Sequence, residues 1–150
     1  MSYKEYMQEA LKLAKFSYNE NEIPVGAVIV KDNKIISYGR NKREQKNNAL
    51  YHAEIEAINN ACKHLNSWRL NDCDIYVTLE PCIMCTGAII NSRIRKIYFG
   101  AYDLKNGFCE SKYNINDLKD NYRPEIQGGI LEDECEKILK DFFNKLRLKK

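Results

Sequence analysis

His52-Ala53-Glu54 and Pro81-Cys82-Ile83-Met84-Cys85 are the two stretches around which the rest of the chain is organised. One imidazole and two cysteines supply three of the four ligands that Zn²⁺ takes in catalytic sites, where water occupies the fourth position. Cys82 and Cys85 are three residues apart, so both sulfurs fall on one face of a helix that begins after Pro81. The two stretches therefore predict a zinc site with one open position.

His52 and Glu54 are only two residues apart, so they would not share a helix face. We therefore expect the metal off the N-terminal end of a helix that starts near His52, where partial positive charge favours thiolates and a bound hydroxide. Glu54 is then placed to take a proton from the bound water and deliver it to a substrate. Simpler interpretations remain open: His52 as a helix-end histidine, and the Cys-x-x-Cys as half of a structural zinc ribbon.

The composition is that of an ordinary globular domain, with 44% hydrophobic and 30% charged residues and 3 prolines in a chain of 150. We expect a single domain spanning residues 1–150. The start of the chain lacks the apolar run of a signal peptide, and no segment approaches a membrane span, so we expect a cytoplasmic protein without a membrane partner. Cys62, Cys73, Cys109 and Cys135 are interpreted as free thiols, mostly in the core.

Apolar spacing predicts where the helices and strands lie. Helices are expected over residues 3–19, 52–65, 82–91 and 131–146, and strands over 23–30, 34–39, 74–80 and 96–101. Residues 40–50 and 102–129 are polar and rich in turn formers, so they are expected to be loops or short irregular elements. Strands that alternate with helices predict an α/β protein, a three-layer α/β/α domain around a mixed sheet of about five strands.

On these motifs the chain resembles the cytidine and deoxycytidylate deaminase superfamily, whose signature is H-x-E followed by P-C-x-x-C. Within it, the chain is most similar to the bacterial tRNA adenosine deaminases. Matching stretches lie at residues 22–28, 41, 52–55, 76–85, 87–88, 92–94, 99–101, 129–131, 133–135 and 141–143. The resemblance implies the cytidine-deaminase-like fold and a homodimer with one Zn²⁺ per subunit, held by His52, Cys82 and Cys85. It also implies that Glu54 catalyses hydrolytic deamination of the wobble adenosine in a tRNA anticodon loop to inosine.

The same resemblance assigns substrate contacts to individual residues. Asn41 would hydrogen-bond the target nucleoside, and the backbone N–H of Ala53 would lie near the base. Glu80 and Pro81 would help to line the pocket. Asp103 would contact the sugar of a neighbouring nucleotide.

Two stretches depart from the pattern of the tRNA enzymes, namely Asn48-Ala49-Leu50-Tyr51 before the histidine and residues 102–111 after the last predicted strand. They add Tyr51, Tyr102 and Phe108 to the candidate substrate-binding residues, because such rings stack on bases. An alternative function is therefore deamination of a free base or nucleoside of the guanine or cytosine type. A third is a catalytically silent scaffold that binds RNA or a partner. Lys42-Arg43 and the basic tail at 145–150 favour RNA.

Overall fold

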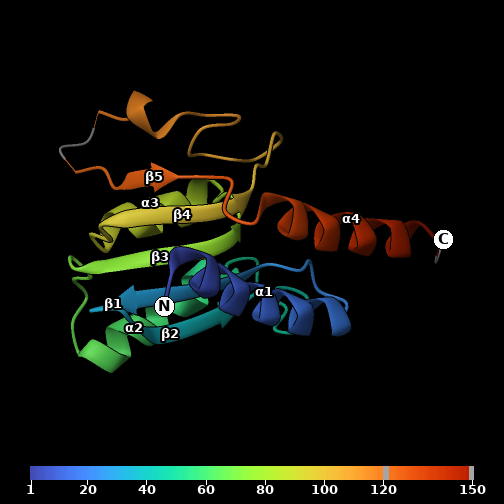
Figure 1. Ribbon diagram of the computed structural model, residues 1–150, viewed down its shortest axis with the longest axis horizontal. Helices are drawn as coiled ribbons and strands as arrows, with labels where there is room; N and C mark the ends of the chain where they lie inside the picture. The colour runs from blue at the N-terminus through green and yellow to red at the C-terminus, as the bar shows by residue number, and fades with distance from the viewer. Residues whose placement is uncertain (120–121, 149–150) are drawn as a thin grey trace.

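The computed structural model describes residues 1–119 and 122–148 (Figure 1). Its elements in chain order are α1 (Tyr3–Asn19), β1 (Gly26–Lys31), β2 (Lys34–Arg40), α2 (Ala53–Leu65), β3 (Cys73–Leu79), α3 (Ile83–Asn91), β4 (Lys96–Ala101), the 3₁₀ helix η1 (Ile115–Asp117), β5 (Glu125–Gln127) and α4 (Glu132–Leu148). The strands form one sheet in the order β2-β1-β3-β4-β5. β1 runs antiparallel to β2 and β3, whereas β3, β4 and β5 are parallel. The predicted mixed sheet of five strands is confirmed.

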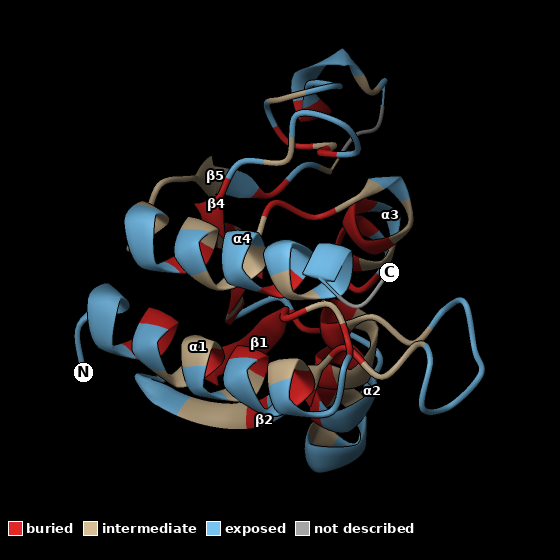
Figure 2. Cartoon of the chain, turned by 90° about the vertical axis from the view of Figure 1, so that its right-hand side faces the viewer, coloured by how far each residue is buried: buried red, intermediate tan, exposed pale blue. Residues whose placement is uncertain are grey.

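The helices cover both faces of the sheet. Figure 1 shows α1 and α4 on one face and α2 and α3 on the other, and Figure 2 shows the buried residues gathered between them. Contacts of β1 with both α1 and α2 explain its almost complete burial. A Cβ atom at Gly26 would overlap the carbonyl oxygen of Ala10, so glycine lets α1 lie directly on the strand. The three-layer α/β/α architecture is thereby confirmed.

Local sequence signals account for most of these elements. Asp32 and Asn33 both adopt positive φ, at 50° and 62°, which is the geometry of a two-residue hairpin turn between β1 and β2. α2 and α3 each begin one residue later than expected, because His52 and Cys82 are extended N-cap residues. The basic tail predicted at 145–150 begins inside α4, and its last two residues lie outside the described chain.

No sequence pattern predicts β5, which lies within the stretch expected to be irregular. Its three residues are too few for a periodic pattern, and the strand exists because Ile126 pairs with Ile97 at the open edge of β4. Across residues 1–119 and 122–148, no helix has both the length and the apolar character needed to cross a membrane.

Candidate active site

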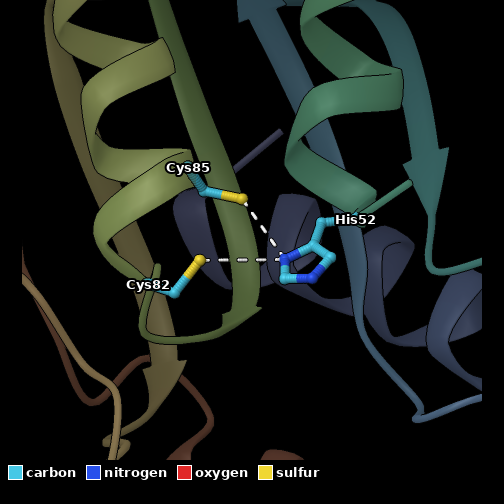
Figure 3. Close-up of side chains that lie close together, drawn as sticks. All are labelled: His52, Cys82 and Cys85. Atoms are coloured by element: carbon cyan, nitrogen blue, oxygen red, sulfur yellow. Dashed lines mark hydrogen bonds between the residues drawn. The ribbon is translucent and has the colours of Figure 1, made fainter. Parts of the chain in front are cut away.

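His52, Cys82 and Cys85 come together where α2 and α3 begin (Figure 3). The Nδ1 atom of His52 lies 3.8 Å from the Cys82 sulfur and 3.5 Å from the Cys85 sulfur. A tetrahedral zinc ion with ordinary bond lengths would set a nitrogen–sulfur separation of about 3.6 Å. All three donor atoms lie within 4.8 Å of one another, so the cluster fits one metal ion of that size.

The charge of the cluster is set by contacts among its own side chains. A hydrogen bond from the Cys85 thiol lowers the pKa of Cys82 to about 4 against the effect of burial, and His52 adds to the lowering. The same contact with Cys82, together with burial, raises the pKa of Cys85. The hydrogen bond to Cys82 also raises the pKa of His52, although burial acts in the opposite direction. Cys82 is therefore a thiolate at neutral pH, the form in which cysteine binds metals.

Glu54 is the acid–base group beside the cluster. It occupies the first turn of α2, is only 4% exposed, and hydrogen-bonds with Cys85. Burial raises its pKa to about 7, while the charge of His52 acts in the opposite direction. A carboxyl group with this pKa exchanges protons readily near neutral pH, as a general acid and base must.

A cavity of about 530 Å³ opens over the cluster, a size typical of sites for small ligands. Besides the two metal-site residues His52 and Cys82 and the acid–base residue Glu54, the lining comprises Ile23, Val25, Asn41, Arg43, Ala53, Leu79, Glu80, Ile83, Asp103, Lys105, Asn106, Lys112 and Tyr113. Three of these residues are basic, namely Arg43 from one loop and Lys105 and Lys112 from another, and the rest of the cavity surface is mostly apolar.

Four of the residues predicted to contact substrate line this cavity: Asn41, Ala53, Glu80 and Asp103. Asn41 is 6% exposed, and its amide donates to the Ile23 carbonyl and accepts from the Arg43 N–H. These two bonds hold the Asn41 side chain in one orientation at the cavity wall.

Asp103 shapes the loop from which it projects. Its Oδ1 atom accepts hydrogen bonds from the backbone N–H groups of Lys105 and Asn106, both at 3.1 Å. The carboxylate thereby closes a tight turn directly after β4, and the turn places Lys105 and Asn106 at the cavity.

The other four predicted contact residues are not among those that line the cavity. Pro81 is buried, and its carbonyl accepts a hydrogen bond from the Phe108 N–H. The Phe108 ring packs against Tyr113 and borders a separate hollow beside α3. Tyr51 hydrogen-bonds with Glu56 on the outer side of α2, and the Tyr102 ring packs edge-on against Phe99.

Sequence reasoning missed about half of the residues that line the cavity. Ile23, Val25 and Leu79 form apolar parts of it, and they read only as strand or core residues in the sequence. Lys112 and Tyr113 reach it from a segment that has no periodic pattern. Of the basic pair expected to favour RNA, Arg43 lines the cavity, whereas Lys42 is paired with Glu56 at 2.8 Å.

A His/Cys/Cys cluster with a neighbouring buried glutamate, on a three-layer α/β/α fold, defines the class of hydrolytic nucleobase deaminases. The sequence profile of the MafB19-like deaminases matches residues 1–147. A relative from Rickettsia felis is 51% identical over 144 residues, which cover 94% of this chain and 100% of the relative. One from Bacillus subtilis is 44% identical over 146 residues, which cover 97% of this chain and 91% of the relative. Both are named tRNA-specific adenosine deaminase. The chain belongs to this deaminase family, as its motifs predicted.

Solved structures agree with this assignment. A structure from a study of A-to-I editing by tRNA:A34 deaminases superposes with a TM-score of 0.87 at 39% identity, covering 90% of this chain and 99% of that one. A guanine deaminase from Bacillus subtilis gives a TM-score of 0.65 at 40% identity, covering 68% of this chain and 66% of that one. The likeness to the tRNA enzyme thus extends over more of the chain.

The low pKa of Cys82 predicts selective alkylation after a chelator has removed any bound metal. At about pH 6, iodoacetamide should modify Cys82 faster than the other cysteines, because only its thiol is largely ionised. Burial raises the pKa of Cys73 to about 11 and those of Cys109 and Cys135 to about 12. Peptide mass spectrometry measures the rates. A Cys82 rate that rises only above about pH 8, as for an ordinary thiol, would contradict the assigned charge.

Proposed function

We propose that residues 1–150 form a single zinc-dependent deaminase domain that converts adenosine to inosine at the wobble position of a tRNA anticodon loop. The observation that carries the proposal is the buried Glu54 beside the His/Cys/Cys cluster, at the base of a cavity with a basic rim. The near-full-length similarity to tRNA-specific adenosine deaminases supports the choice of substrate. A tRNA substrate also implies a cytoplasmic location.

The proposed chemistry assigns separate roles to the metal site and to Glu54. His52, Cys82 and Cys85 would hold Zn²⁺, which when bound supplies an acidic water as the nucleophile. The Glu54 carboxylate accepts a proton from the attacking water and passes it to a ring nitrogen of adenine. The same carboxylate then takes the proton of the hydroxyl group newly attached to C6 and delivers it to the departing amino group, so that water and adenosine give inosine and ammonia.

Arg43, Lys105 and Lys112 support an RNA substrate, because they line the cavity and their positive charges attract the phosphates that flank a flipped-out base. Tyr113 is half exposed at the same rim and offers a ring on which a neighbouring base could stack. The similarity to a guanine deaminase keeps a free base as the competing substrate.

The substrate is tested with the zinc-loaded protein. An anticodon stem-loop that carries wobble adenosine should yield inosine and one equivalent of ammonia. Guanine, cytosine, adenine and their nucleosides, assayed in parallel, should yield far less. Inosine formation at low substrate concentration should also fall steeply as salt rises, because phosphate contacts release counterions.

The outcomes separate the alternatives. Ammonia from free bases alone would replace the tRNA proposal with the free-base alternative. A zinc-loaded protein that binds the stem-loop and deaminates nothing would favour the silent scaffold.

Glu54→Gln should keep the metal and lose the activity. The amide cannot carry the proton, and the loss of a general acid–base group lowers the rate by about 10²–10⁴-fold. Zinc content, measured by elemental analysis, should match that of the wild type. The matched variant Cys85→Ser should instead lose zinc, because it removes a ligand from the same buried cluster. A Glu54→Gln protein with a near-normal rate would refute the assigned role.

We also propose that the protein is a homodimer, as its family resemblance implies. A hollow beside α3 supports this, because it is lined partly by the apolar residues Ile83, Ile90, Phe108 and Leu118. Ile83 is 64% exposed and borders both this hollow and the cavity. A second copy seated there would cover apolar surface right next to the site.

Gly87→Arg tests this arrangement, because Gly87 borders the hollow and an added Cβ meets nothing within 4 Å. The variant should fold normally and yet run as a monomer in light scattering, whereas the wild type should have twice the 17.6 kDa chain mass. Asn59→Arg adds the same charge on exposed α2 and should stay dimeric. A wild-type monomer, or a dimeric Gly87→Arg protein, would count against this interface.

A further inference from the structure

Glu80 is a buried carboxylate whose side-chain hydrogen bonds all come from one loop, residues 102–113. It follows the last residue of β3, is 2% exposed, and its backbone N–H pairs with the Ala101 carbonyl at 2.8 Å. Its side chain is directed into the loop of residues 102–113, which connects β4 to the segment before η1. Figure 1 shows this loop leaving the end of β4.

The carboxylate of Glu80 is saturated by donors from the 102–113 loop. Its Oε1 atom accepts from the Asp103 N–H at 3.1 Å and from the Ser111 hydroxyl. Its Oε2 atom accepts from the N–H groups of Cys109, Glu110 and Ser111 at 3.1, 2.7 and 3.0 Å. A carboxylate offers about four lone-pair sites, so five donors leave none for a substrate.

The 102–113 loop supplies much of one cavity wall. Asp103, Lys105, Asn106, Lys112 and Tyr113 line the cavity, and all of them come from this loop. The loop contains no helix or strand, so no regular ladder of backbone hydrogen bonds holds it in place. The position of these side chains therefore depends on the few contacts that fix the loop, and Glu80 provides five of them.

Gly107 shows how closely the loop and Glu80 fit. A Cβ atom at Gly107 would overlap the carboxyl carbon of Glu80 and lie 2.5 Å from the Asp103 carbonyl oxygen. Any larger residue would have to push the loop away from the carboxylate. A substitution at residue 80 or at residue 107 would therefore disturb the contact between Glu80 and the loop.

We propose that Glu80 is a positioning residue, which determines substrate affinity by fixing the 102–113 loop as a wall of the cavity. It does so without touching the substrate or the reacting atoms. The proposal rests on the proposed function for the identity of the substrate and on the loop contacts for everything else.

Three variants test the proposal: Glu80→Gln, Gly107→Ala and Ser111→Ala. Glu80→Gln replaces one carboxylate oxygen with an NH₂ group, which cannot accept hydrogen bonds from the backbone N–H groups of the loop. Gly107→Ala disturbs the same contact while Glu80 stays intact. Both should raise KM for the stem-loop by about tenfold and change kcat by less than about threefold, because they weaken binding and leave the chemistry alone. Ser111→Ala removes one bond and should have a smaller effect in the same direction.

Hydrogen exchange gives a readout that does not depend on turnover. The amides of Asp103, Cys109, Glu110 and Ser111 should exchange faster in Glu80→Gln and Gly107→Ala, with zinc content unchanged. Ser37→Ala is the matched control, because it removes a buried hydroxyl bond to the Ala57 carbonyl away from the cavity. It should change neither KM nor exchange in the loop.

The proposal is overturned if exchange in the loop is unaltered in Glu80→Gln, or if kcat falls while KM stays at the wild-type value. It is also overturned if Gly107→Ala, whose Glu80 and metal ligands are intact, leaves KM unchanged. If the wild type deaminates a free base and not the stem-loop, the proposed function fails, and the role of Glu80 is judged on KM for that base.

Discussion

The structure depends on two helix N-termini that meet at one point. His52 immediately precedes α2, and Cys82 immediately precedes α3, on the same face of the sheet. Their donor atoms stay within bonding distance of one ion only while the two helices keep their separation. That separation is held by a continuous core, in which Ala57 and Ala61 of α2 and Ile89 of α3 are buried. Packing of the helices therefore fixes the site.

The metal-site residues occupy positions that usually serve to cap helices. Neither His52 nor Cys82 makes the side-chain hydrogen bond of a helix cap. A capping serine or aspartate would stabilise each helix by about 1 kcal/mol. Here the side chains turn instead toward one another, and the uncapped N–H groups leave their positive ends near the Cys82 thiolate. The N-terminal ends of α2 and α3 are therefore less stable than capped ends would be, because the residues at their N-cap positions form a cluster that is suited to a cation.

The parts of this protein that sequence could predict are those governed by short-range spacing. The helix and strand pattern, the hairpin turn at Asp32-Asn33 and the meeting of His52 with the two cysteines all follow from periodicity and motif. The cavity wall does not follow, because loop side chains are placed by long-range hydrogen bonds. Tyr51 hydrogen-bonds with Glu56, and Phe108 borders the hollow beside α3. These orientations are set by packing in the folded chain, which the sequence pattern does not show.

Buried carboxylates hold both loops that border the cavity. Glu80 fixes the 102–113 loop, and Glu22, only 1% exposed, accepts hydrogen bonds from the N–H groups of Glu44 and Gln45 at 3.0 and 2.6 Å. The second loop carries Arg43 to the rim. Burying an unpaired carboxylate is costly, so each glutamate favours the one loop conformation that supplies its donors. The metal-site residues and Glu54 lie at the N-terminal ends of helices, whereas the basic residues around the cavity lie on loops fixed by Glu22 and Glu80. The sequence of these loops can therefore change while the chemistry of the site stays the same.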